Sequence, residues 1–173
     1  LVGTVMSNLG FEKAWLCRGG SLTRTPVGDQ HVYEAMLKNG SALGGEQSGH
    51  ILSTMNGLCG DGILTALTIA TLCKKQNQSL SDWMDASFEP YPQKLVNIPI
   101  SNSQLNKDWK NCEPLQKAVI GAEQSMGSEG RVLVRTSGTE PVLRVMVEAS
   151  DPQAVEDWTN QLTALAESHF NIT

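Results

Sequence analysis

The 173-residue sequence lacks the features that would place it in several specialised classes of protein. It has four cysteines but no C-x-x-C pair, which argues against a zinc site and against a small disulfide-stapled scaffold. Its longest apolar run, residues 63–73, is interrupted by threonines and is too short to span a bilayer. It has no basic run and a formal net charge of −5, so we expect neither a nucleic-acid nor a membrane partner. The first residues show no signal-peptide pattern, which favours reduced thiols and a cytoplasmic location.

Residues 1–88 alternate short apolar runs with helical patterns, which indicates a three-layer α/β domain. The helix expected from Gly62 to about Lys75 is apolar nearly all round, so we expect it to be buried between layers. The sequence opens on a strand pattern with no helix before it, and the domain is therefore expected to be truncated at its N-terminus. Strands are expected at residues 2–6, 21–25, 42–45 and 49–54, and further helices at 11–17, 31–38 and from 81.

Residues 89–94 are predicted to form a linker, because two prolines within three residues fix φ and remove backbone donors. Residues 95–173 then show strand patterns at 95–100, 130–135 and 142–149. A helical pattern covers 113–126, and a second begins at Asp151-Pro152, with aspartate as N-cap and proline at the first helical position. This order predicts a small α+β domain.

The loop from Arg135 to Pro141 joins two apolar strand patterns and consists mostly of small hydroxyl residues and glycine. Such a loop can direct backbone N–H groups and hydroxyls to one point as an anion nest. Arg135 and Arg144 are equidistant from its centre, so a hairpin would place them opposite each other, where like charges destabilise a sheet. A phosphate between them would remove that cost through bidentate charge-assisted hydrogen bonds. A surface hairpin with two solvated arginines is the alternative.

A second polar loop, residues 44–50, reads GGEQSGH. In a strand-like conformation Glu46, Ser48 and His50 would share one side, because side chains alternate with a period of two. A carboxylate accepting from two neighbouring hydroxyls is suited to a sugar diol. The alternative is a glycine-rich turn with an incidental histidine.

Several motifs follow one another in a fixed order: VMSN at 5–8, VGD at 27–29, GGEQSGH at 44–50, GDG at 60–62 and GRVLVRTSGTEP at 130–141. In order and spacing they resemble the α-D-phosphohexomutase superfamily over nearly the whole chain. The resemblance implies most of the third domain, followed by the whole fourth domain, which has a TATA-binding-protein-like fold. It assigns sugar binding to Glu46, Ser48 and His50. It assigns phosphate binding to Arg135, Ser137, Gly138, Thr139 and Arg144.

In this family a phosphoserine transfers its phosphoryl group to a hexose phosphate through a 1,6-bisphosphate. The subgroup with the most similar pattern converts glucosamine 6-phosphate to glucosamine 1-phosphate, on the way to UDP-N-acetylglucosamine and peptidoglycan. The phosphoserine loop and the magnesium loop belong to the first two domains, so we expect this chain to bind neither cofactor and to be inactive alone. Its expected partners are a hexosamine phosphate, the N-terminal domains of the same enzyme and a second copy in a homodimer.

Two other functions are open from the sequence. The chain is also compatible with a mannose- or glucose-phosphate mutase of the same superfamily, or with a non-catalytic sugar-phosphate-binding module. One position departs from the family pattern: Pro26 stands where a substrate-facing lysine is common. We expect that Arg24 or a residue outside this chain replaces that amine, or that the contact is lost.

Overall fold

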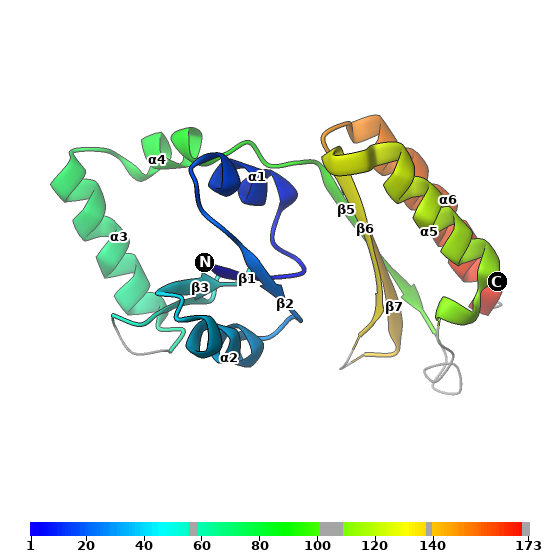
Figure 1. The fold of residues 1–173 in the computed structure, drawn as a ribbon, viewed down its shortest axis with the longest axis horizontal. Coiled ribbons are helices and arrows are strands. Elements are labelled where there is room, and N and C mark those ends of the chain that lie inside the picture. Colours follow the sequence, from blue (N-terminus) through cyan, green and yellow to red (C-terminus); the bar gives the residue numbers. More distant parts are fainter. Residues whose placement is uncertain (56–58, 101–108, 138–139, 171–173) are drawn as a thin grey trace. The chain divides into compact units, whose positions relative to one another are not determined.

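The computed structural model describes residues 1–55, 59–100, 109–137 and 140–170. It divides into two compact units, Leu1–Pro90 and Tyr91–Thr173 (Figure 1). The division falls inside residues 89–94, and the first strand of the second unit, β5 (Gln93–Pro99), begins within that range. None of the described helices is both long enough and apolar enough to cross a membrane.

The first unit is built on a four-stranded sheet with the strand order β2-β1-β3-β4. Its strands are β1 (Val2–Thr4), β2 (Thr23–Thr25), β3 (Leu43–Gly45) and β4 (Ile51–Ser53). Strand β1 is parallel to both β2 and β3, and β4 is antiparallel to β3. Since β2 and β3 flank β1 on opposite sides, right-handed crossovers put the two connecting helices on opposite faces of the sheet. These helices are α1 (Leu9–Cys17) and α2 (Asp29–Asn39) (Figure 1).

Helix α2 covers one face of this sheet and forms a small core with it. Val32 and Met36 of the helix are buried against Val2 and Leu52 of the strands. A Cβ atom at Gly44 would lie 2.6 Å from both the Met36 sulfur and a Val32 methyl group. Glycine at this position therefore allows β3 and α2 to approach each other closely.

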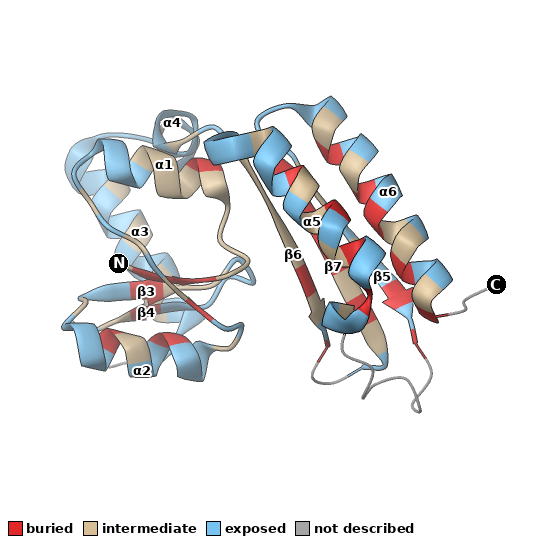
Figure 2. Cartoon of the chain, turned by 45° about the vertical axis from the view of Figure 1, so that its right-hand side comes forward, coloured by how far each residue is buried: buried red, intermediate tan, exposed pale blue. Residues whose placement is uncertain are grey.

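Helix α3 (Gly62–Gln76) has the expected ends, but the prediction that it is buried is wrong (Figure 2). The Asp61 carboxylate accepts from the Leu64 N–H at 2.9 Å, as an N-cap should. None of its residues is buried, and Ile63 is 77% exposed. An apolar pattern shows that a helix needs a cover but does not specify which segment supplies it. The following helix, α4 (Leu80–Ser87), has no buried residue either.

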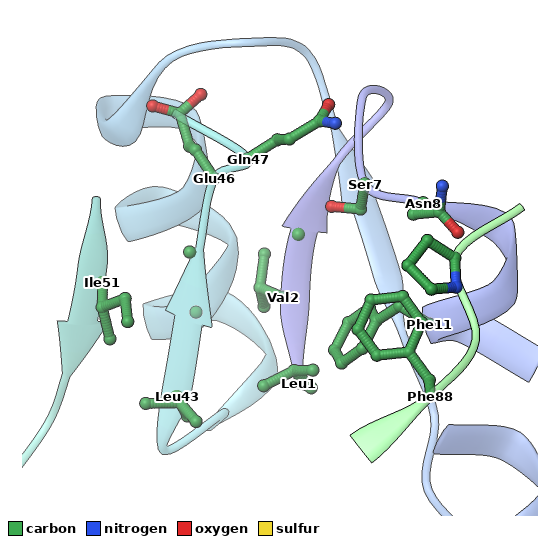
Figure 3. Close-up of a pocket in the computed structure, with 14 residues that line it drawn as sticks. Leu1, Val2, Ser7, Asn8, Phe11, Leu43, Glu46, Gln47, Ile51 and Phe88 are labelled. Atoms are coloured by element: carbon green, nitrogen blue, oxygen red, sulfur yellow. The ribbon is translucent and has the colours of Figure 1, made fainter. Parts of the chain in front are cut away.

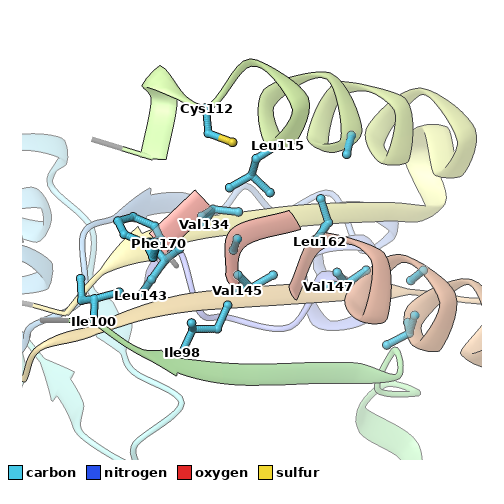
Figure 4. Packing of buried hydrophobic residues seen from close by; sticks show 14 residues of the cluster. Ile98, Ile100, Cys112, Leu115, Val134, Leu143, Val145, Val147, Leu162 and Phe170 are labelled. Atoms are coloured by element: carbon cyan, nitrogen blue, oxygen red, sulfur yellow. The ribbon is translucent and has the colours of Figure 1, made fainter. Parts of the chain in front are cut away.

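The second unit is a three-stranded antiparallel sheet with the order β5-β7-β6, which confirms the α+β prediction. Strands β6 (Gly130–Thr136) and β7 (Val142–Ala149) form the hairpin, and helices α5 (Glu113–Met126) and α6 (Pro152–Phe170) pack on one face. Short 3-10 turns, η2 (Trp109–Asn111) and η3 (Gly127–Glu129), flank α5. The core lies between sheet and helices (Figure 4), with these among its buried residues: Leu115, Leu143, Val145, Val147 and Leu162.

The other face of this sheet carries the alternate residues of β7, which are Val142, Arg144, Met146 and Glu148. Glu148 is fully buried and its carboxylate accepts from Arg131 Nε at 2.5 Å, directly across the β6–β7 pair. A buried carboxylate is tolerable only with such a partner. The face therefore carries polar groups near both ends, with the Arg131–Glu148 pair near one end and Arg144 near the other.

Candidate functional site

Three loops of the first unit emerge from the same edge of its sheet. Strands β1, β2 and β3 are parallel, so their carboxyl ends meet at this edge, and the loops that follow are residues 5–8, 26–28 and 46–50. In open α/β sheets, ligands bind outside the carboxyl ends of the strands, where neighbouring connections run to opposite faces. Here the loop after β1 leads to α1 on one face and the loop after β2 leads to α2 on the other, which makes this edge the candidate site of the first unit.

Glu46 follows β3 directly and is held by the loop after β2. The Gly28 N–H donates to Glu46 Oε1 at 2.8 Å, and the Glu46 side chain is only 9% exposed. Its second oxygen, Oε2, lies 3.8 Å from His50 Nδ1. One carboxylate oxygen thus anchors two loops to each other, and the other is directed towards His50.

Residues 47–49 form a hairpin turn, so the strand-like conformation expected for this loop is wrong. The Glu46 N–H donates to the His50 carbonyl at 2.9 Å, and the Gly49 N–H donates to the Glu46 carbonyl at 3.0 Å. Gly49 has φ of 99°, a backbone conformation that favours glycine. The turn still brings the three predicted sugar-binding side chains together, because Ser48 Oγ and His50 Nδ1 lie 3.0 Å apart.

Arg24 does not replace the lysine that Pro26 displaces. Its Nε and Nη2 atoms donate to Glu12 Oε2 at 3.0 and 2.6 Å. Its Nη1 donates to the carbonyls of Thr4 and Ser7 at 3.1 and 2.7 Å. The guanidinium therefore holds the β1–α1 loop in place, and the two remaining predictions for this site are an amine from outside this chain or loss of the contact.

Three polar residues at this edge were not identified from the sequence: Ser7, Asn8 and Gln47. All three line one groove of about 440 Å³ together with Glu46 (Figure 3). Asn8 also caps α1 by accepting from the Gly10 N–H at 2.9 Å. Their position could have identified them, because each lies in a loop that follows the carboxyl end of a parallel strand.

The second unit brings Arg135 and Arg144 directly opposite each other across the β6–β7 pair, as their spacing predicted. The Nε atoms of both are buried and have no hydrogen-bond partner among the described residues. Desolvation by burial, and secondarily the charge of Arg144, lowers the pKa of Arg135 from its ordinary value. Arg144 donates to Glu140 Oε2 at 2.9 Å, whereas no ion pair of Arg135 occurs in the described part of the chain.

Asn97 extends this row and was also missed from the sequence. In the β5–β7 register it lies directly opposite Arg144, so Asn97, Arg144 and Arg135 stand side by side on the face that the helices leave uncovered. Cβ atoms of directly opposed residues are about 4.5–5.5 Å apart, within reach of one shared ligand. Only the three-dimensional strand order shows this, because β5 and β6 are distant in sequence and β7 lies between them.

The remaining predicted phosphate-binding residues, Ser137, Gly138 and Thr139, follow β6 in the sequence. Ser137 is buried, and its N–H donates to the Val142 carbonyl at 2.9 Å, which closes the base of the turn. Gly138 and Thr139 lie outside the described residues. The structure thus describes two opposed guanidinium groups with the buried Ser137 following β6, and this group is the candidate anion site.

Two domains of one protein family match consecutive parts of the chain. Residues 1–91 match "Phosphoglucomutase/phosphomannomutase, alpha/beta/alpha domain III", and residues 95–165 match "Phosphoglucomutase/phosphomannomutase, C-terminal domain". The chain belongs to the phosphoglucomutase/phosphomannomutase family.

Curated relatives match nearly the whole chain at high sequence identity. The chain is 64% identical over 171 residues to the phosphoglucosamine mutases of Parasynechococcus marenigrum and of Prochlorococcus marinus (strain MIT 9303). The match covers 99% of this chain but only 37% and 36% of these relatives. The chain therefore spans little more than a third of the length of the proteins it matches.

Solved structures share the fold at much lower identity. The Aspergillus fumigatus N-acetylphosphoglucosamine mutase in complex with glucose 1,6-bisphosphate matches with a TM-score of 0.81 and 18% identity, over 98% of this chain and 38% of that one. The same enzyme in complex with GlcNAc-6P and magnesium matches with a TM-score of 0.78 and 18% identity, over 98% and 39%. At this identity the likeness establishes the fold.

Proposed function

We propose that this chain is the sugar-phosphate-binding part of a phosphoglucosamine mutase, which interconverts glucosamine 6-phosphate and glucosamine 1-phosphate. The observation that carries the proposal is the directly opposed pair Arg135 and Arg144, with both Nε atoms buried and unpartnered in the described structure. Sequence identity of 64% to phosphoglucosamine mutases supports this substrate class.

The paired guanidinium groups are suited to the phosphate of the substrate. Two like charges in direct opposition repel each other, and burial weakens the solvent screening that would relieve them. A phosphate dianion accepts bidentate hydrogen bonds from both groups and removes the repulsion. The same desolvation and repulsion lower the pKa of Arg135.

The carboxyl-end edge of the first unit is suited to sugar hydroxyl groups. Glu46 Oε2 and the neighbouring pair Ser48–His50 supply acceptors and a hydroxyl, and Ser7 and Gln47 add polar atoms along the same groove. We assign sugar discrimination to this edge and phosphate affinity to the second unit.

The chemical step is assigned to the part of the enzyme outside this chain. Phosphoryl transfer requires a positioned nucleophile and compensation of the developing charge. Among the described residues, no three histidine, cysteine, aspartate or glutamate side chains lie together in a way that could hold a metal ion. The proposal for the whole enzyme also includes magnesium, the phosphoserine, a cytoplasmic location and a homodimer. It further includes a role in UDP-N-acetylglucosamine and peptidoglycan synthesis.

Replacing one guanidinium tests the anion site. Arg135→Gln is expected to weaken glucosamine 6-phosphate binding by about 1.5–3 kcal/mol, as for a lost hydrogen bond to a charged group. It should also raise the unliganded stability by about 0.2–1 kcal/mol, because the repulsion with Arg144 is removed. Calorimetric titration of the 173-residue chain measures the first effect, and urea unfolding measures the second.

Lys117→Gln is the matched control, because it removes one positive charge from the exposed side of α5, where Lys117 pairs with Glu113. Equal losses of affinity in both variants would show that the effect comes from net charge alone. Unchanged affinity in Arg135→Gln would show that the Arg135–Arg144 pair does not bind the phosphate. Turnover of glucosamine, glucose and mannose 6-phosphates by the full-length enzyme would decide between phosphoglucosamine mutase and another mutase of the family.

A further inference from the structure

The groove at the carboxyl-end edge of the first unit has two polar sides. Glu46 and Gln47 are consecutive, but their side chains diverge (Figure 3). The Glu46 carboxylate is held by the Gly28 N–H and directed towards His50. The Gln47 side chain extends the other way, towards the β1–α1 loop that carries Ser7. Ser7 and Gln47 therefore form a second polar side of the groove, separate from the side of Glu46 and His50.

The β1–α1 loop is fixed by hydrogen bonds at both of its ends. The Thr4 N–H donates to Ser7 Oγ at 3.1 Å, and the Ser7 N–H donates to the Thr4 carbonyl at 3.0 Å. The Ser7 hydroxyl folds back over β1, where a Cβ atom at Gly3 would lie 2.5 Å from Ser7 Oγ. Arg24 Nη1 binds the carbonyls of Thr4 and Ser7, and its other two nitrogens pair with Glu12. The Ser7 hydroxyl is thus pre-positioned at the groove, which lowers the entropic cost of binding a ligand there.

The electrostatics of the groove favour a cationic group. Among the described residues that line it, Glu46 is the only one with an ionisable side chain, and none is lysine or arginine. Arg24, on the neighbouring strand β2, is paired with Glu12. The Glu46 side chain is only 9% exposed, so solvent screens its charge weakly. A positively charged group in this groove would therefore meet a carboxylate and neutral oxygen atoms, with no cationic side chain among the described lining residues.

Glucosamine phosphates carry such a group beside a diol. Carbons 3 and 4 bear the pair of adjacent free hydroxyls that the 6-phosphate and the 1-phosphate have in common, and the amino group is on carbon 2. In its protonated form this group has N–H donors and no acceptor, so it requires oxygen acceptors. We infer that Ser7 Oγ and the Gln47 amide oxygen bind the 2-amino group, next to the diol at Glu46. This inference rests on the proposed function, because it takes a glucosamine phosphate as the ligand.

Gln47 and Ser7 are then the residues that distinguish glucosamine from glucose phosphates. The two sugars differ at carbon 2, which carries an amino group in one and a hydroxyl in the other. An ammonium group makes charge-assisted hydrogen bonds to these oxygen atoms, and such bonds are roughly twice as strong as those of a neutral hydroxyl. The nearby Glu46 carboxylate adds an attraction that a hydroxyl does not receive. The difference in charge at carbon 2 therefore becomes a difference in affinity.

Gln47→Met tests this assignment, because it keeps the length of the side chain and removes both of its polar atoms. Calorimetric titration of the 173-residue chain gives the ratio of its affinities for glucosamine 6-phosphate and glucose 6-phosphate. This ratio should fall by about tenfold or more, as for a lost hydrogen bond to a charged group, while glucose 6-phosphate affinity changes little. Gln76→Met is the matched control, since Gln76 is exposed at the end of α3. An unchanged ratio in Gln47→Met would overturn the inference.

Two further variants fix the direction of the effect. Gln47→Glu supplies a second carboxylate and should raise the ratio, because an ion pair replaces a hydrogen bond to a neutral oxygen. Ser7→Ala should lower the ratio. Both affinities are measured on the same sample, so a loss of stability in this variant cancels from their ratio. A lower ratio in Gln47→Glu, or an unchanged ratio in Ser7→Ala, would contradict the inference.

The same titrations separate the inference from the proposed function. Equal binding of glucosamine and glucose 6-phosphates by the unsubstituted chain would overturn the inference and leave the phosphate site at Arg135 and Arg144 in place. Binding of neither sugar phosphate more tightly than inorganic phosphate would overturn the proposed function, and the inference would fail with it.

Discussion

At the scale of single residues, the candidate sites combine binding with structural roles. Glu46 is proposed to recognise a sugar, yet one of its oxygens accepts the Gly28 N–H and holds two loops together. Arg135 has the opposite character, since it has no ion-pair partner in the described structure and its charge is repelled by Arg144. A residue that contributes to the fold tolerates only isosteric substitution, whereas one held against repulsion is replaceable without loss of stability.

Glu46→Gln should separate these two roles. The amide oxygen of glutamine still accepts from Gly28, so stability should change by less than about 1 kcal/mol, within the usual range of a single neutral hydrogen bond. Glucosamine 6-phosphate affinity should fall while inorganic phosphate affinity is preserved, as measured by calorimetry. Glu34→Gln, on α2, is the control. Equal losses for both ligands would place Glu46 outside the sugar site.

At the scale of elements, strand order creates the anion site. Arg144 stands on the central strand β7, with Arg135 on one side and Asn97 on the other. The hairpin alone would present two arginines, and β5 adds an amide that can donate to a phosphate oxygen. The row Asn97–Arg144–Arg135 is thus a property of the three-stranded sheet.

Asn97→Asp is expected to weaken inorganic phosphate binding by about tenfold or more, because a carboxylate opposite Arg144 competes for its guanidinium and repels the anion. The substitution preserves size and changes one charge. Phosphate titration followed by NMR measures the effect, and Asn111→Asp, an exposed change outside the sheet, is the control. Undiminished affinity in Asn97→Asp would exclude position 97 from the site.

At the scale of the whole molecule, the two units have very unequal cores. Among the residues that the structure describes, the buried cluster of the second unit has fourteen members, and that of the first has four: Val2, Val32, Met36 and Leu52. Burial of apolar side chains is the main favourable term in folding. The second unit should therefore be the more stable of the two in the 173-residue chain.

Hydrogen exchange should reveal this difference. Amides of β7 are expected to exchange at least about tenfold more slowly than those of β1, because local stability follows buried apolar contact. Urea unfolding should accordingly show two transitions rather than one. A single transition with uniform protection would contradict the unequal cores.

The sequence by itself determined the class of each unit, most element boundaries to within two residues, and the opposition of Arg135 and Arg144, because periodicity, caps and hairpin spacing are local properties. It also carried the motifs that resemble the phosphohexomutases. The tertiary structure decided what depends on distant segments: the hydrogen bond from Gly28 to Glu46, the engagement of Arg24 by Glu12, the row through Asn97 and the exposure of α3. An apolar helix pattern requires burial but does not specify which segment packs against the helix, since the hydrophobic effect is not directional.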